Sequence, residues 1–169
     1  IADLKCEKFI VEKIRTKFPD HGILGEESGE SSAGSEFKWI VDPVDGTKNF
    51  MRKYPFWGTL LALEHEEEIV LGIISMPVLN DFVYAAKGMG CFYNNKKTKV
   101  SKVSTLKDAY LLHGGIDYIS RENYKDNFLN LARACYYSRG FGDCHGHSFI
   151  IKGKAEIILD PHVAPWDVA

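Results

Sequence analysis

The sequence has no long hydrophobic run and no excess of charge of either sign. Hydrophobic residues make up 45% of the 169 residues, but no run approaches the roughly 20 apolar residues of a membrane-spanning helix. The 21 basic and 23 acidic residues leave a formal net charge of −2. Because both signs are mixed along the chain, neither nucleic acid nor a membrane surface is expected as a partner. The first residues resemble a helix interior rather than a signal peptide, which predicts a cytoplasmic protein.

Paired cysteine spacing is also missing. The four cysteines are Cys6, Cys91, Cys135 and Cys144, and in a chain without an export signal they indicate reduced thiols. The segment CHGH at residues 144–147 could serve a soft metal. No second cluster completes the tetrahedral set of a zinc site, so zinc is kept only as an alternative.

Helix and strand patterns alternate along a chain without internal repeats, low-complexity segments or linkers. An amphipathic helix is predicted over residues 3–18, with Phe9, Ile10, Ile14 and Phe18 on one face. A loop is predicted over 28–36 and a polar turn over 94–97. Strands are predicted over 22–25, 37–41, 57–64, 69–75, 82–86, 91–93, 110–115, 137–140 and 156–160. Further helices are predicted over 46–52, over about 121–135 and from about 143.

This order predicts a mixed α and β fold. The strands from residue 57 to residue 93 follow one another closely, so we expect an antiparallel meander. The length suits one domain over residues 1–169. A first region of helix and antiparallel sheet would cover about 1–105, and a second region of strands and helices about 106–169.

The most informative segment is WIVDPVDGTKNF, at residues 39–50. An apolar strand runs into Asp42 and Asp45, and a buried pair of carboxylates is costly unless a cation neutralises it. Pro43 is expected to end the ordinary strand, and Gly46 permits a turn whose backbone N–H groups can face an anion. Carboxylates beside a hydroxyl and free amides suit phosphate-ester hydrolysis with hard metal ions. The alternative is that the two aspartates only stabilise a turn.

Two further acidic motifs accompany this segment, GEES at residues 25–28 and PWDVA at residues 165–169. The ordered set GEES, WIVDPVDGTKNF and PWDVA resembles the inositol monophosphatase family of magnesium-dependent, lithium-sensitive phosphomonoesterases. Nearly the whole chain aligns in order with the central part of that family. The resemblance implies a layered α-β-α-β-α sandwich. Family members begin with a further helical segment and continue well past the Trp-Asp motif, so the chain is expected to be incomplete at both ends.

The resemblance also implies a metal site built from oxygen ligands. Glu26, Asp42 and the backbone carbonyl of Val44 would hold one ion. Asp42, Asp45 and Asp167 would hold another, so that Asp42 bridges the two. Oxygen ligands favour Mg²⁺ over Zn²⁺, with Mn²⁺ as a substitute. Two or three Mg²⁺ ions are the expected cofactors.

Catalytic roles follow from the same resemblance. The family threonine at the position of Thr47 helps to orient the attacking water, and Asp3 matches its acidic partner. Thr47, Asp3 and Glu26 are therefore the expected catalytic residues. Gly46 and Thr47 are expected to bind the phosphate at the start of a short helix. Asp3 could instead only cap the first helix, as aspartate often does.

The substrate is predicted from the segments around Asp143 and Asp160, which resemble the histidinol-phosphatase branch more than the inositol branch. Asp45, Asp143 and Asp160 are the expected substrate-binding residues. Their carboxylates could accept hydrogen bonds from the ammonium and imidazole groups of L-histidinol phosphate. Asp143 could instead cap a helix, and Asp160 could form a strand-end turn. The alternative substrates are inositol 1-phosphate and other small sugar or nucleotide phosphates.

Two other classes of protein fit parts of the sequence. Haloacid-dehalogenase-type phosphatases also place aspartates after a strand, but two apart, whereas Asp42 and Asp45 are three apart. A non-catalytic binding paralogue is the other alternative, although it would have no reason to keep all four acidic ligands. The expected partners are a small phosphate ester and a second copy of the chain. An exposed apolar strand at residues 57–63 could form the contact of such a homodimer.

Overall fold

The computed structural model of the chain describes residues 1–31, 34–121 and 124–169. Within these residues the strands form one sheet of eight strands, β2-β1-β3-β4-β5-β6-β7-β8, and one of three strands, β10-β9-β11. The larger sheet contains β1 (Gly22–Gly25), β2 (Gly29–Ser31), β3 (Phe37–Asp45), β4 (Gly58–His65), β5 (Glu68–Met76), β6 (Asp81–Ala86), β7 (Gly90–Tyr93) and β8 (Lys96–Thr98). The smaller sheet contains β9 (Tyr110–His113), β10 (Tyr137–Arg139) and β11 (Ile157–Leu159).

The larger sheet is an antiparallel meander from β3 to β8, as the sequence predicts. β1 departs from this pattern because it runs parallel to β3, and β2 returns antiparallel to β1. Residues along β4 alternate between buried and partly exposed, because successive side chains of a strand point to opposite faces. The larger sheet can therefore pack helices on both of its faces.

The smaller sheet is parallel. Parallel strands need long crossover connections, which are usually helical. α3 (Ile116–Arg121) and α4 (Lys125–Ala134) connect β9 to β10, and α5 (Asp143–Ile151) connects β10 to β11. A short 3₁₀ helix, η1 (Leu106–Asp108), precedes β9. Apart from the parallel pair of β1 and β3, the change from antiparallel to parallel pairing therefore falls between β8 and β9.

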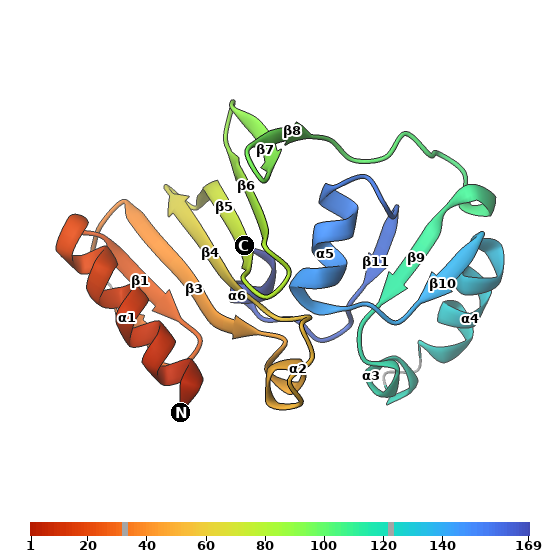
Figure 1. The fold of residues 1–169 in the computed structure, drawn as a ribbon, viewed down its shortest axis with the longest axis horizontal. Coiled ribbons are helices and arrows are strands. Elements are labelled where there is room, and N and C mark those ends of the chain that lie inside the picture. Colours follow the sequence, from red (N-terminus) through yellow and green to blue (C-terminus); the bar gives the residue numbers. More distant parts are fainter. Residues whose placement is uncertain (32–33, 122–123) are drawn as a thin grey trace.

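Helices cover and separate the two sheets (Figure 1). α1 (Ala2–Lys17) lies on the outer face of the larger sheet, α5 lies between the sheets, and α3 and α4 lie beyond the smaller sheet. Two short helices complete the fold: α2 (Thr47–Met51) follows β3, and α6 (Pro165–Val168) packs against β3 and β4. The arrangement confirms the layered α-β-α-β-α sandwich that the family resemblance implies.

Apolar clusters join the layers on the two faces of the larger sheet. On the outer face, Ile14 of α1 packs with Trp39 and Val41 of β3. On the inner face, Cys144 of α5 packs with Leu60 of β4 and with Met76 at the end of β5. Burying one such large apolar side chain stabilises the fold by about 1.5–3 kcal/mol. The larger sheet is thus held from both sides, and β3 lies in the middle of this packing.

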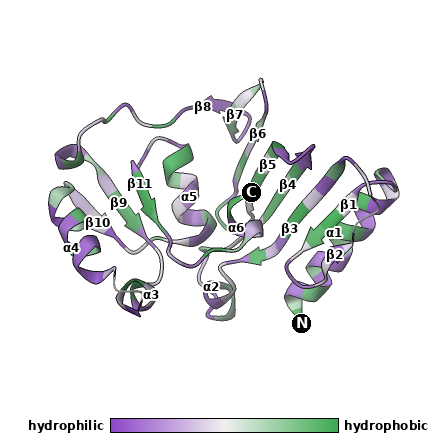
Figure 2. Cartoon of the chain, turned by 180° about the vertical axis from the view of Figure 1, so that it is seen from behind, coloured by the Kyte–Doolittle hydropathy of each residue, from purple (hydrophilic) through white to green (hydrophobic). Residues whose placement is uncertain are grey.

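A third apolar cluster joins the smaller sheet to α3 and α4. Its buried members are Ala109, Leu111, Ile119, Phe128 and Cys135. Figure 2 shows the same pattern by hydropathy: the strands β9 and β11 are mainly hydrophobic, whereas α4 carries both kinds of residue. Among the described helices, none combines the length and the apolar character that crossing a membrane requires.

The structure corrects the predicted end of the strand before the aspartate motif. Pro43 was expected to end the strand, but β3 continues through Pro43 to Asp45. The pairing with β4 shifts register between Asp42 and Asp45, and proline is tolerated at such irregularities because no ladder hydrogen bond is required of it there. Both aspartates therefore belong to the strand rather than to a loop.

Other predicted boundaries also move. β2 lies inside the loop predicted over 28–36, of which residues 32–33 lie outside the described part. β8 begins inside the turn predicted over 94–97. Two helices, α3 and α4, replace the single helix predicted over about 121–135, where residues 122–123 are not described. Phe9 was expected on the buried face of the first helix, but it is 61% exposed.

The exposed strand predicted at residues 57–63 is a further correction. β4 is a central strand, paired with β3 on one side and β5 on the other, and Leu60 and Ala62 are buried. Hydrophobic patterning does not distinguish a central strand from an edge strand, because both can carry apolar residues. This segment is therefore not available as a free edge for a second copy of the chain.

Candidate metal centre

β3 carries two buried carboxylates, Asp42 and Asp45, which are 2% and 8% exposed. The backbone N–H of Val44 donates to Asp42 Oδ1 at 2.9 Å. The hydroxyl of Thr59 on β4 donates to the carbonyl of Pro43 at 2.9 Å. These contacts fix the irregular part of the strand, and with it the direction of both aspartates.

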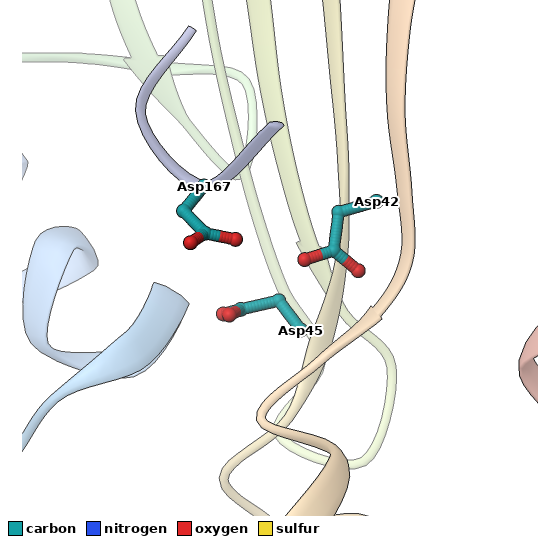
Figure 3. Close-up of side chains that lie close together, drawn as sticks. All are labelled: Asp42, Asp45 and Asp167. Atoms are coloured by element: carbon teal, nitrogen blue, oxygen red, sulfur yellow. The ribbon is translucent and has the colours of Figure 1, made fainter. Parts of the chain in front are cut away.

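A third carboxylate reaches the same point from the end of the chain. Asp167 lies in α6, where the backbone N–H of Ala164 donates to its Oδ2 at 2.6 Å. One carboxylate oxygen from each of Asp42, Asp45 and Asp167 lies within 4.8 Å of the others. Figure 3 shows the three side chains pointing toward one another, two from β3 and one from α6. Residues more than 120 positions apart thus form one acidic cluster.

The cluster is tied to the start of α5. The backbone N–H of Cys144 donates to Asp45 Oδ2, which links the larger sheet to the helix between the sheets. Burial first, and the neighbouring Asp45 carboxylate second, raise the pKa of the Cys144 thiol. The thiol therefore stays protonated, and all four cysteines of the chain are free.

The electrostatics of the cluster favour a bound cation. Burial raises the pKa of Asp42 to about 9, and the negative charges of Asp45, Glu26 and Asp167 add to the shift. Burial likewise raises the pKa of Asp45 to about 6, although the hydrogen bonds from Cys144 oppose that shift. Buried carboxylates that repel one another are costly without a compensating positive charge. An all-oxygen set of this kind matches the ligands that Mg²⁺ and Mn²⁺ prefer.

Glu26 lies next to this cluster, directly after β1. Its backbone N–H donates to the carbonyl of Val41 at 3.1 Å, so the segment after β1 stays beside β3. The residue is exposed overall, and partial burial of its carboxyl group raises its pKa, with contributions from the charges of Asp167 and Asp3. A hydrogen bond with Asp42 opposes that rise. The four carboxylates predicted as ligands are thus neighbours in the fold.

Gly46 and Thr47 follow the cluster at the turn from β3 into α2. Gly46 has φ of 78°, and a Cβ added there would lie 2.9 Å from the carbonyl oxygen of Phe56, so a side chain does not fit. The hydroxyl of Thr47 donates to the carbonyl of Val44 at 2.9 Å. The hydroxyl therefore contacts the same carbonyl that is predicted as a metal ligand. The proton relay from Thr47 to Asp3 stays a prediction.

The helix-cap alternative for Asp3 is wrong, because α1 begins at Ala2 and Asp3 lies in its first turn. The Asp3 side chain is instead close enough to Glu26 for its charge to help raise the pKa of Glu26. The catalytic role of Asp3 stays a prediction.

Asp143 and Asp160 lie together on the side of the smaller sheet. The backbone N–H of Asp143 points to Asp160 Oδ2 at 3.4 Å, and burial raises the pKa of both carboxyl groups. Asp143 has φ of 54° at the start of α5, which is unusual for a residue other than glycine and is often found at functional sites. Gly142, and not Asp143, occupies the helix-cap position.

An open cavity of about 490 Å³ lies in front of these residues. It is lined by residues from both sheet regions: Glu26, Gly46, Thr47, Lys48, Asn49, His113, Gly114, Gly115, Asp117, Tyr118, Gly140, Gly142, Asp143, Asp160 and His162. A narrower neighbouring cavity is lined by Asp45, Asp143, Asp160 and Asp167 together with His147, His162 and Val163. Of the predicted substrate residues, Asp143 and Asp160 therefore line both cavities, and Asp45 belongs to the acidic cluster and lines the narrower one.

Sequence reasoning missed two residues that support the site. The side-chain amide of Asn49 donates to Asp143 Oδ2 at 3.2 Å and to the carbonyl of Phe56 at 2.9 Å. Asn49 belongs to the aspartate motif, so its position was a usable signal. Glu7 is buried in α1 and contacts the segment around Glu26. A single acidic residue in an amphipathic helix gives no such signal.

The zinc alternative gains no support from the geometry. Cys144 and His145 are buried, and the His145 ring stacks on Phe56 with centroids 4.5 Å apart. In the part of the chain that the structure describes, the group of three possible metal-ligating side chains is the acidic cluster of Asp42, Asp45 and Asp167.

The fold and the acidic cluster together define a layered α/β protein with a candidate centre for divalent metal ions. All 169 residues, 1–169, match the family model described as the inositol monophosphatase family. The chain belongs to that family. Because the chain belongs to the inositol monophosphatase family, the haloacid-dehalogenase alternative is excluded.

Curated relatives and solved structures agree with this family. The chain is 34% identical over 168 residues to a histidinol-phosphatase of Chlorobaculum parvum, with 99% of the chain and 65% of the relative covered. It is 31% identical over 176 residues to an inositol monophosphatase of Dictyostelium discoideum, with 99% and 65% covered. The crystal structure of the extragenic suppressor protein suhB from Bartonella henselae matches at 30% identity and a TM-score of 0.92, covering 99% of this chain and 66% of that one. The chain spans about two thirds of the length of these curated relatives.

Proposed function

We propose that this protein hydrolyses small phosphate monoesters with the help of Mg²⁺. The observation that carries the proposal is the meeting of Asp42, Asp45 and Asp167 within 4.8 Å, beside an open cavity. The names of the relatives, histidinol-phosphatase and inositol monophosphatase, support the same class of reaction.

The acidic cluster would hold the metal ions. Glu26, Asp42 and the carbonyl of Val44 would bind one ion, and Asp42, Asp45 and Asp167 would bind a second. A third ion is part of the proposal. The raised pKa of Asp42 and of Asp45 supports this assignment, because a cation would relieve the repulsion that causes part of each shift. When bound, the ions supply positive charge that offsets the phosphate dianion and acidifies a water molecule.

The remaining residues would position the reactants. Gly46 and Thr47 would contact the phosphate, since both line the open cavity beside Glu26. The Thr47 hydroxyl, which donates to the Val44 carbonyl, would also accept a hydrogen bond from the attacking water and thereby orient it. Either Glu26 or Asp3 would accept the one proton that the water loses. Transfer to Asp3 through Thr47 would require the Thr47 hydroxyl to turn from the Val44 carbonyl toward Asp3. Correct placement of reacting groups is itself a large part of such catalysis.

We assign L-histidinol phosphate as the preferred substrate. Asp143 and Asp160, together with Asp45, would accept hydrogen bonds from its ammonium and imidazole groups. These carboxylates line the cavities next to the acidic cluster, and charge-assisted bonds of this kind are the strong ones. Inositol 1-phosphate is the second candidate, because a relative of that activity is 31% identical. Association into a homodimer is part of the proposal, through a surface other than β4.

Phosphate release from a panel of esters tests the proposal. Histidinol phosphate, inositol 1-phosphate, fructose 1,6-bisphosphate and adenosine 3′,5′-bisphosphate would be compared with Mg²⁺ and with a chelator. We expect turnover only with Mg²⁺, and fastest on histidinol phosphate. Faster turnover of inositol 1-phosphate would favour the second candidate. No turnover of any ester by a protein that binds Mg²⁺ would favour the non-catalytic paralogue.

A further inference from the structure

Glu7 is a buried acidic residue in the middle of α1, only 2% exposed. Its carboxylate faces the segment that follows β1. Glu7 Oε2 accepts the backbone N–H of Glu27 at 2.9 Å, and Oε1 accepts the backbone N–H of Ser28 at 2.9 Å. Both oxygens of one carboxylate are therefore used to hold two consecutive amides of the GEES segment.

Gly25, which precedes Glu26, also lies directly against the Glu7 carboxylate. A Cβ added to Gly25 would lie 2.6 Å from Glu7 Cδ and from Oε1. Real Cβ atoms do not approach other atoms so closely, so the carboxylate occupies the space that a side chain at position 25 would need. Glycine at this position lets the helix and the end of β1 come into direct contact.

Glu26 is thus held on both sides through its backbone. Its own N–H donates to the carbonyl of Val41 in β3, and the two following N–H groups donate to Glu7. The side chain of Glu26 remains exposed, so packing alone does not fix its direction. The backbone bonds hold the chain on both sides of Glu26, and a hydrogen bond joins its carboxyl group to Asp42.

We propose that Glu7 is a positioning residue that holds Glu26 in place as a metal ligand. The inference rests on the proposed function in one respect, the assignment of Glu26 as a ligand. Burying a carboxylate is costly unless its hydrogen bonds are made, and here those bonds are made to the segment that carries the ligand. Groups that orient metal ligands in this way typically change metal affinity 10- to 100-fold when they are replaced.

A purely structural role is the competing explanation. In that case Glu7 would stabilise the contact between α1 and β1 without any effect on the metal site. The two roles separate in the metal affinity of folded protein, because a structural loss lowers the midpoint of unfolding but leaves the affinity of the remaining folded molecules unchanged.

The test compares Glu7→Gln with Glu12→Gln. Glutamine keeps the size of the side chain but replaces one acceptor by an N–H donor, so only one of the two amides can be bonded. Glu12 lies on the same helix with its side chain 63% exposed, which makes it a matched control. Mg²⁺ binding without substrate would be measured by titration calorimetry, and unfolding would be measured in chelator. We expect Glu7→Gln to weaken Mg²⁺ binding about 10- to 100-fold and Glu12→Gln to leave it unchanged.

Gly25→Ala gives a second test with Glu7 intact, which serves if Glu7→Gln does not fold. The added methyl group would displace the Glu7 carboxylate, so Mg²⁺ affinity should fall. In a Glu7→Ala background the same methyl group has space, so Gly25→Ala should cause little further loss. Unchanged Mg²⁺ affinity in either Glu7→Gln or Gly25→Ala would overturn the inference.

Hydrolysis by the unmodified protein distinguishes failure of the Glu7 proposal from failure of the proposed function. A protein that binds Mg²⁺ but hydrolyses no ester would contradict the proposed function, and the Glu7 comparison would still be decided by calorimetry. A protein that hydrolyses esters, but whose Glu7→Gln variant keeps its metal affinity, would contradict the role of Glu7 alone.

Discussion

The larger sheet presents Asp42 and Asp45 from within β3, whereas the smaller sheet presents Asp143 and Asp160 from the segments next to its strands. The first pair is buried and held by the pairing of β3 with β4. The second pair is only partly buried and lines an open cavity. The proposed function uses this difference: it assigns metal binding to the buried pair on the larger sheet, and it assigns substrate recognition mainly to the pair beside the smaller sheet.

Asp167 joins the two parts. It follows the smaller sheet in the sequence, but α6 packs against β3 and β4, and the carboxylate reaches the pair on β3. The backbone N–H of Cys144 makes the second connection, from α5 to Asp45. The proposed site therefore depends on both regions being folded, which couples metal binding to the assembly of the layers.

The largest effect is expected from Asp45→Asn, which tests the proposed metal-binding carboxylates of the larger sheet. The change removes a negative charge from a predicted ligand but keeps its shape and its acceptor for the Cys144 N–H. Transition-state stabilisation by metal ions is worth several kcal/mol, so we expect kcat/KM to fall on the order of 100-fold or more. Steady-state phosphate release measures this, with circular dichroism to check the fold. Turnover within about threefold of the unmodified protein would contradict the assignment.

A smaller and more selective effect is expected from Asp143→Asn, which tests the proposed substrate-binding carboxylates beside the smaller sheet. Asparagine tolerates the positive φ of this position better than alanine does, so the backbone should be kept. Loss of a charge-assisted hydrogen bond costs about 1.5–3 kcal/mol, or roughly 10- to 150-fold in kcat/KM for histidinol phosphate.

The ester p-nitrophenyl phosphate, whose leaving group carries no ammonium or imidazole group, is the control for Asp143→Asn. Its hydrolysis should barely change, because the acidic cluster and Thr47 are untouched. Equal losses on both esters would mean that Asp143 supports the fold or the metal site instead.

Lithium should partially inhibit phosphate-ester hydrolysis at millimolar concentrations by acting at the proposed metal site. The expectation comes from the family resemblance, in which Li⁺ takes the place of one Mg²⁺ after catalysis. A Li⁺ titration at saturating substrate and several Mg²⁺ concentrations measures it, with NaCl at equal ionic strength as the control. Full activity at high Li⁺ would place the chain outside the lithium-sensitive pattern.

The smallest effect concerns stability without metal. The folded Asp42 carboxyl has a pKa of about 9, against 3.8 for the ordinary value. Between these values the folded state holds the extra proton, so its stability falls as the pH rises. From pH 7 to 8.5 in chelator, the unfolding midpoint should fall by at most roughly 3–5 °C per pH unit.

Asp42→Asn is the matched variant for this pH dependence. It should flatten the slope, because the titrating carboxyl group is gone. Differential scanning calorimetry checks both proteins in the same buffers. An equal slope in the two proteins would show that other groups, such as the thiols, cause the dependence.

Much of the fold followed from local patterns, and the site followed from motifs. The strand over Gly22–Gly25 was predicted to the residue, and the meander was predicted from apolar runs separated by turns. Two features were not accessible in this way. The position of β4 inside the sheet depends on its neighbours, and the passage of β3 through Pro43 depends on a register shift that composition does not encode.

Prediction of the candidate site from the sequence was limited in the same way as prediction of the fold. Its predicted ligands lie in three short motifs, so their identity could be inferred from a resemblance. Glu7 and Asn49 support the site through contacts made only in the folded chain. The positive φ of Asp143 is likewise a property of the packed start of α5.

Direct titration of Mg²⁺ into the unmodified protein and into Asp42→Asn tests the central claim, that the carboxylates of β3 and α6 form a metal site. Asp42 is the predicted bridging ligand, so the unmodified protein should bind Mg²⁺ and the variant should bind it at least about tenfold more weakly. Equal Mg²⁺ affinity in the two folded proteins, or no binding by either, would contradict the claim.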